Sequence, residues 1–179
     1  TFSDRKSNFF LASARLLSYK RIDIIVEAFN QLKWPLLITG DGPERKRLEA
    51  AASDNIMFLG YVSDKERCRL LSQARGVIVA ALEDYGLVPI EANFSGTPVV
   101  AYGAGGVKDT QVPGTTGLFF ETQSAESLVE TLLKFKDIPW DYKQIRNHAE
   151  QSFTTKVFFE KLERVIQEVC ESPDLAPAN

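Results

Sequence analysis

Side chains that commonly bind metals are scarce in this chain of 179 residues. It has one histidine, His148, and two cysteines, Cys68 and Cys170, which lie far apart and form no Cys-x-x-Cys pair. A single histidine with two isolated cysteines cannot build a zinc site. This scarcity predicts a cytoplasmic protein that binds no metal.

An excess of charge of one sign and a long apolar run are missing as well. Lys and Arg total 21 against 24 for Asp and Glu, which leaves a net charge of −3. This balance gives no electrostatic reason to expect nucleic acid or an anionic membrane as a partner, so any bound anion must be held locally. No signal peptide or membrane-spanning run is recognisable. The chain begins at Thr1 without a methionine, and we expect it to be a piece of a longer protein.

What the chain does have is the composition of a globular domain with regularly alternating segments. Apolar residues make up 44% and charged residues 25%, which excludes collagen-like and disordered classes, and the length predicts one domain. Short apolar runs predict strands at residues 9–14, 36–39, 56–59, 76–80, 97–101 and 117–120. Amphipathic patterns predict helices at 22–29, 44–52, 66–74 and 88–95, and three more in succession at 124–135, 142–151 and 154–171.

These strands read as continuous apolar runs, which is typical of strands buried on both faces and joined by right-handed β-α-β crossovers. The predicted fold class is therefore α/β: a Rossmann-like, doubly wound sheet of about six parallel strands with flanking helices and additional C-terminal helices. Residues 1–172 are predicted to form this domain, and residues 173–179 a frayed tail.

Two cations follow the first predicted strand, where ligands of open parallel sheets bind. The fork of Arg15 suits a two-point contact with phosphate, and Lys20 supplies a point charge. From spacing alone, a solvated pair of surface cations is an equally good interpretation.

The loop after the fourth predicted strand carries Glu83 and Gly86, and Glu91 lies in the helix that follows. Gly86 allows close approach of a ligand, and the amides that open the helix favour phosphate. Carboxylates beside a phosphate site suit the hydroxyl groups of a sugar. Alternatively, Glu91 only complements the helix dipole and Glu83 is solvated. A second glycine-rich loop, with Gly105 and Gly106, follows the fifth strand and is weak evidence by itself.

Six sequence elements together resemble the carboxyl-terminal, donor-binding domain of GT-B fold glycosyltransferases of family 4. They are Ala14-Arg15-Leu16-Leu17 leading to Lys20, Gly40-Asp41-Gly42-Pro43, Leu59-Gly60-Tyr61-Val62, the Glu-x7-Glu stretch from Glu83 to Glu91, Gly105-Gly106, and Gly114-Thr115-Thr116-Gly117-Leu118. The resemblance covers about residues 9–170. Three places depart from the family pattern: Ala14 and Arg21 stand where Gly is usual, and Lys108-Asp109 replaces Pro-Glu, so no role is carried over from that Glu.

The resemblance implies a role for each candidate residue. Arg15 and Lys20 would neutralise the diphosphate of a nucleotide-sugar, together with backbone amides of Gly86, Leu87 and Val88. Glu91 would accept hydrogen bonds from the ribose, and Glu83 from the transferred sugar. The backbone near Tyr61 and Val62 would meet the nucleobase, and Gly105 and Gly106 would shape the floor of the site. The family's reaction retains anomeric configuration and uses no metal or further cofactor.

The stretch from Glu83 to Glu91 looks most like the mannosyltransferase branch, whose usual donor is GDP-mannose. A UDP-glucose or UDP-galactose transferase, a sugar-nucleotide epimerase and a non-catalytic nucleotide-binding module remain alternatives, whereas the lack of a GxGxxG motif argues against a dehydrogenase. The resemblance also implies that an N-terminal acceptor domain is absent from this chain. We therefore expect the chain to bind donor and to transfer little alone, in the cytoplasm or, through the missing domain, at the inner face of a membrane.

Overall fold

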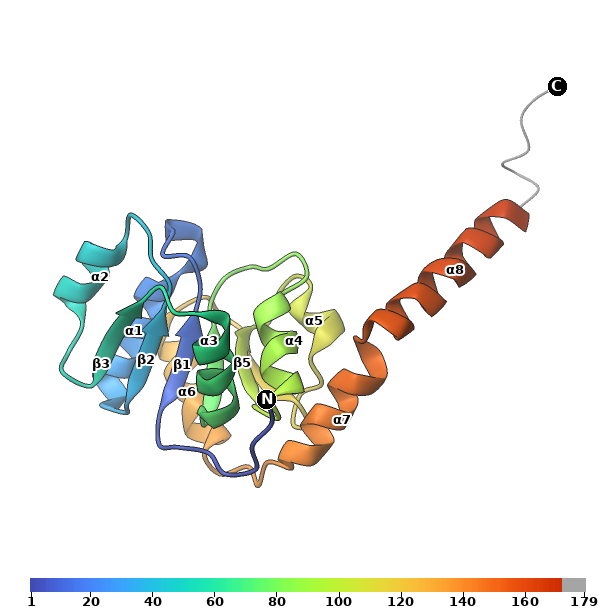
Figure 1. Ribbon diagram of the computed structural model, residues 1–179. Coiled ribbons are helices and arrows are strands. Elements are labelled where there is room, and N and C mark those ends of the chain that lie inside the picture. The colour runs from blue at the N-terminus through green and yellow to red at the C-terminus, as the bar shows by residue number, and fades with distance from the viewer. Residues whose placement is uncertain (172–179) are drawn as a thin grey trace.

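A computed structural model describes residues 1–171, so the predicted tail at 173–179 lies outside the described residues. The strands are β1 (Phe10–Ser13), β2 (Leu36–Thr39), β3 (Ile56–Gly60), β4 (Gly76–Val79), β5 (Val99–Tyr102) and β6 (Gly117–Phe120). They form one parallel sheet in the order β3-β2-β1-β4-β5-β6 (Figure 1). The predicted α/β fold is confirmed.

Helices cover both faces of this sheet (Figure 1). The helices α1 (Ile22–Leu32), α2 (Arg45–Ala51) and α6 (Ala125–Phe135) pack on one face, and α3 (Asp64–Gln73), α4 (Leu87–Phe94) and α5 (Val107–Thr110) on the other. Successive strand residues alternate between the two cores: Phe10 and Ala12 lie with Phe29 of α1, whereas Leu11 lies with Leu70 of α3. This double burial is why the strands are apolar throughout.

Two short elements differ from the sequence prediction. A 3-10 helix, η1 (Ser18–Lys20), and the four-residue helix α5 occupy segments expected to be loops. Neither is long enough to produce a periodic apolar pattern, so the sequence carried no signal for them.

The last two helices leave the sheet. Helix α7 (Tyr142–Ser152) packs against α4, and α8 (Thr155–Glu171) projects away from the body of the domain (Figure 1). The phenylalanines and aliphatic residues along one side of α8 are exposed: Phe158, Phe159, Leu162, Val165, Ile166 and Val169. Within residues 1–171, no helix combines the length and the apolar character needed to cross a membrane.

The strand order indicates where on the sheet a ligand would bind. The chain proceeds from β1 toward β2 and β3 on one side, and from β4 toward β5 and β6 on the other. Because β1 and β4 are neighbours, the loops that follow them diverge at the carboxyl edge of the sheet and leave a crevice between them. Ligands of open α/β sheets bind at this point.

Candidate nucleotide-sugar site

A pocket of about 370 Å³ occupies the crevice at the carboxyl ends of β1 and β4. The loop after β1 contributes Arg15, Tyr19 and Lys20, and the loop after β4 contributes Glu83 together with the first residues of α4. Candidate residues that lie more than 60 positions apart in the sequence thus line one cavity. This agreement between topology and residue type makes the pocket the candidate site.

The loop that carries Arg15 is held by the neighbouring turn after β2. Ala14 N donates to Thr39 O at 3.1 Å, and Leu16 N donates to Asp41 O at 2.9 Å. The turn approaches so closely that a Cβ on Gly40 would lie 1.9 Å from Ala14 O. The Gly40–Pro43 turn therefore holds the backbone on either side of Arg15 and does not itself line the pocket.

Lys20 and Glu83 meet across the pocket. The ammonium Nζ of Lys20 donates to Glu83 Oε1 at 2.7 Å, and the two side chains are only 18% and 22% exposed. The Lys20 Nζ also lies 4.9 Å from the centre of the Tyr19 ring. Among the side chains of residues 1–170, no carboxylate pairs with Arg15, which leaves its guanidinium donors available in the same pocket. An anionic ligand would meet two cations here, one of them by displacing a carboxylate.

The start of α4 adds backbone donors. Gly86 is its N-cap with φ 81° and ψ 72°, a left-handed conformation that favours glycine, and no side chain caps the helix. The first N–H groups of a helix have no partner within it, and here Gly86, Leu87 and Val88 line the pocket. The positive end of the helix dipole therefore faces the same space as Arg15 and Lys20.

Gly105 and Gly106 support the Glu83 loop. Gly106 N donates to Glu83 O at 2.8 Å, and Gly105 forms an isolated parallel bridge with Glu83. A Cβ on Gly106 would lie 2.0 Å from Asp84 O, so the two loops can touch only because no side chain intervenes. The pair lies behind the pocket lining, and its direct contact with a ligand stays a prediction.

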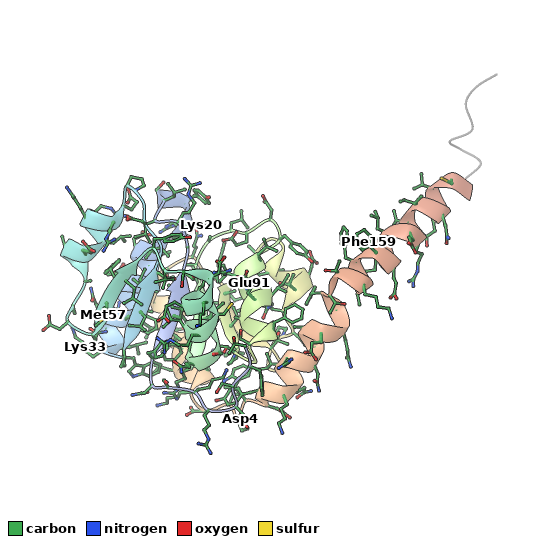
Figure 2. All side chains as sticks on the ribbon, in the orientation of Figure 1. Asp4, Lys20, Lys33, Met57, Glu91 and Phe159 are labelled. Carbon is green, nitrogen blue, oxygen red and sulfur yellow. The ribbon has the colours of Figure 1, made fainter. Side chains whose placement is uncertain are left out.

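Tyr61, Val62 and Glu91 also lie outside this lining. Tyr61 and Val62 follow β3 and precede α3, and the Tyr61 side chain is almost fully exposed. Glu91, labelled in Figure 2, lies one turn into α4. Both of its carboxylate oxygens pair with the guanidinium of Arg67 in α3. The Nη2 to Oε1 distance is 3.0 Å, and the Glu91 carboxylate raises the pKa of Arg67 above its usual value.

Arg21 is the non-glycine residue next to Lys20, and it holds a left-handed conformation, with φ 50°. Its guanidinium pairs with Asp23 at 3.3 Å and donates to Gln123 Oε1 at 3.1 Å. Gln123 Nε2 in turn donates to Ala80 O at 2.8 Å, at the end of β4. The departure from the family's usual glycine is thus accompanied by contacts that reach across to the second loop of the pocket.

A family model described as "Glycosyl transferases group 1" matches residues 1–152. The chain belongs to this family. The GT-B type of fold expected from the resemblance agrees with solved structures. The apo form of the lipopolysaccharide outer core galactosyltransferase WaaB aligns with a TM-score of 0.81 at 18% identity, over 93% of this chain and 51% of that chain. Anabaena Alr3699/HepE in complex with UDP-glucose aligns with a TM-score of 0.77 at 20% identity, over 90% and 49% of the two chains.

One curated relative comes from Corynebacterium glutamicum. It is the "GDP-mannose-dependent monoacylated alpha-(1-6)-phosphatidylinositol monomannoside mannosyltransferase", 28% identical over 175 residues, which are 87% of this chain and 46% of that protein. The chain therefore spans about half the length of this relative and of the two solved structures.

The structure brings together Arg15, Lys20, Glu83, Gly86, Leu87 and Val88. The other candidates lie outside the pocket lining: Glu91, Tyr61, Val62, Gly105 and Gly106. No sequence pattern indicated a role for Arg67. Its partner Glu91 is 24 positions away on another helix, and no motif spacing links the two residues. A pairing set by how two helices pack on a sheet is visible only in the folded chain.

Proposed function

We propose that this chain is the donor-binding half of a retaining glycosyltransferase and that a nucleoside diphosphate sugar binds in the pocket between β1 and β4. The observation that carries the proposal is the convergence of Lys20, Arg15 and the start of α4 on one cavity of about 370 Å³. A diphosphate needs such a combination of fixed cations and backbone donors. Carboxylates at its border suit sugar hydroxyls.

Each residue has a defined role in this proposal. Arg15 and Lys20 neutralise the diphosphate as it leaves, and the amides of Gly86, Leu87 and Val88 bind its oxygens. Glu83, released from Lys20, accepts hydroxyl groups of the transferred sugar. Glu91 accepts the ribose hydroxyls, and the backbone around Tyr61 and Val62 meets the base. No bound metal and no further cofactor take part, because the two cations balance the charge of the leaving group.

The preferred donor is GDP-mannose, from which a hexose passes to a glycan or lipid-linked acceptor. The support is the Corynebacterium relative, whose name specifies GDP-mannose. UDP-glucose or UDP-galactose is the alternative, supported by the fold likeness to the UDP-glucose complex of HepE. Both donors share the diphosphate on which the pocket argument rests.

The partner that completes the enzyme is an N-terminal acceptor domain of the same polypeptide. Two observations support it: the chain spans about half of its relatives, and the apolar side of α8 is exposed along its length. That second half would supply the acceptor site and decide any peripheral association with a membrane. This chain alone would bind donor and transfer little.

Calorimetric titration of the chain with GDP, UDP and ADP, at up to millimolar concentration, tests the proposal. One diphosphate is expected to bind, and Arg15→Ala should weaken it about 10- to 100-fold because a charge-assisted contact is lost. Lys46→Ala removes an exposed cation from α2, away from the pocket, and should bind like the parent chain. Absence of binding by all three nucleotides would contradict the proposal.

A further inference from the structure

Glu91 is unusual among the candidate residues because both oxygens of its carboxylate accept hydrogen bonds from one arginine. Leu87, which lines the pocket, precedes Glu91 by four positions, so the two side chains share one face of α4. Glu91 therefore lies one turn beyond a residue that lines the pocket, on the side of α4 that meets α3. Both of its oxygens are held there by Arg67 of α3.

Arg67 is itself firmly placed. It lies in the first turns of α3, whose start is capped by Ser63 Oγ accepting from Glu66 N, and Arg67 N donates to Ser63 O at 2.8 Å. Its side chain is 27% exposed, and the other carboxylate near it is Asp64, 3.8 Å from Nε. Arg67 does not line the pocket. Its charge is directed at Glu91.

We propose that Arg67 is a positioning residue, which holds the Glu91 carboxylate in one orientation so that it accepts the ribose hydroxyls of the nucleotide. The inference rests on the proposed function. A carboxylate has about four acceptor positions, so the two-point contact with Arg67 leaves acceptor positions for hydroxyl donors. Arg67 acts through Glu91 and does not touch the ligand.

An ion pair between two helices can also serve stability alone, so the test must measure hydroxyl recognition. The chain is titrated with GDP and with 2′,3′-dideoxy-GDP, and with UDP and its dideoxy form if UDP is the nucleotide that binds. The parent chain should prefer the ribonucleotide about tenfold or more, because hydrogen bonds to a charged acceptor are lost in the dideoxy form.

Arg67→Gln should remove most of this preference: binding of the ribonucleotide weakens about tenfold, whereas binding of the dideoxy form is unchanged. Arg67→Lys, which cannot contact both oxygens in one plane, should fall between the two. Glu91→Gln should also abolish the preference, and adding Arg67→Gln to it should change the preference no further. Arg69→Gln on the same helix removes an exposed pair with Glu66 and serves as the control.

Thermal unfolding of each variant confirms that it is folded. Equal weakening of both nucleotides by Arg67→Gln, or an unchanged preference, would overturn the positioning role while leaving the proposed function standing. If the parent chain binds no nucleotide, the proposed function fails first and the role of Arg67 fails with it. The Arg67→Lys variant keeps the test decisive if Arg67→Gln does not fold.

Discussion

The two edges of the sheet each hold a partly buried lysine, and the two ammonium groups have opposite surroundings. At the carboxyl edge, Lys20 pairs with a carboxylate and borders a cavity. At the amino edge, Lys6 donates to Ser72 O at 2.8 Å, to Ser95 O at 3.3 Å and to Thr97 Oγ1 at 2.7 Å, all of them uncharged. Figure 2 labels Lys20 at one edge and Asp4, two residues before Lys6, at the other.

The difference separates the lysine that we propose to bind diphosphate from one that only ties segments of the fold together. Burial lowers the pKa of Lys6 to about 8, because neutral acceptors compensate only part of the lost hydration. Its contacts tie the segment before β1 to the ends of α3 and α4. Lys6 does not line the pocket between β1 and β4. Lys20 has a charged partner that an anionic ligand can replace. Burial alone therefore does not identify a functional lysine, whereas an exchangeable charged partner beside a cavity does.

The largest expected effect comes from removing each lysine in turn. Lys20→Met should weaken nucleoside diphosphate binding about 100-fold, because it deletes a charged contact to phosphate. Lys6→Met should leave the dissociation constant within about twofold, since Lys6 lies at the opposite edge of the sheet. Calorimetric titration measures both. Comparable losses from the two variants would remove the distinction between the edges.

The second comparison is between two glycines, Gly106 at the carboxyl edge of the sheet and Gly96 at the amino edge, at which an added Cβ would clash. Gly106→Ala places a Cβ 2.0 Å from Asp84 O, and Gly96→Ala places one 2.5 Å from Phe2 Cε2 and 2.8 Å from Tyr142 O. Each change should lower the free energy of unfolding by about 1–3 kcal/mol, as overpacking usually does. Gly106→Ala should in addition weaken nucleotide binding, because it displaces the Glu83 loop.

Chemical denaturation gives the two stabilities, and titration of the folded variants gives the affinities. Gly96→Ala is the matched control, since it disturbs only the amino edge. A folded Gly106→Ala variant with the affinity of the parent chain would show that the glycine pair does not support the site.

A third, smaller effect tests the surroundings assigned to Lys6 at the amino edge: the dependence of the free energy of unfolding on pH. The pKa of Lys6 is about 8 in the folded chain and ordinarily 10.5 for a lysine in water, so between these pH values the unfolded state binds more protons. Stability contributed by this group should therefore rise with pH across that window. After allowance for solvent screening, the rise is on the order of 1 kcal/mol.

Urea denaturation at pH 7.5, 9 and 10.5 measures this rise, and Lys6→Met supplies the reference in which it is missing. The difference in stability between the two chains should shift in favour of the parent chain as the pH increases. A difference that stays constant over this range would contradict the pKa assigned to Lys6.

The sequence predicted the sheet well because each strand is a run of apolar residues buried on both faces. The main boundary difference is at β5, which begins at Val99, whereas a strand from residue 97 was expected. Pro98 has no N–H to offer the sheet, and Thr97 instead donates through Oγ1 to Leu71 O. Strand boundaries of this kind depend on side-chain contacts that apolar patterns do not record.

The site was predictable in part for the same reason. Parallel strands end at one edge, so Arg15, Lys20 and Glu83, which follow β1 and β4, could be expected near one another once the topology was inferred. The ion pair between Arg67 and Glu91 was not predictable, because it depends on how α3 lies beside α4. The support that Gly106 gives to the Glu83 loop is a backbone contact, which leaves no side-chain pattern in the sequence.

The smallest expected effect concerns Arg21, which borders Lys20 and belongs to the binding edge. Arg21 holds a left-handed conformation that costs a residue with a Cβ about 1 kcal/mol. Arg21→Gly relieves this cost because glycine has no Cβ, but it also removes the contacts to Asp23 and Gln123. These exposed contacts are worth about as much, so thermal unfolding should show a change within about 1 kcal/mol. Gln123→Ala, which loses the contact without relieving the backbone, should be the less stable variant. The reverse order would mean that the Arg21 contacts outweigh the strain, and that this arginine stabilises the binding edge in place of the family's glycine.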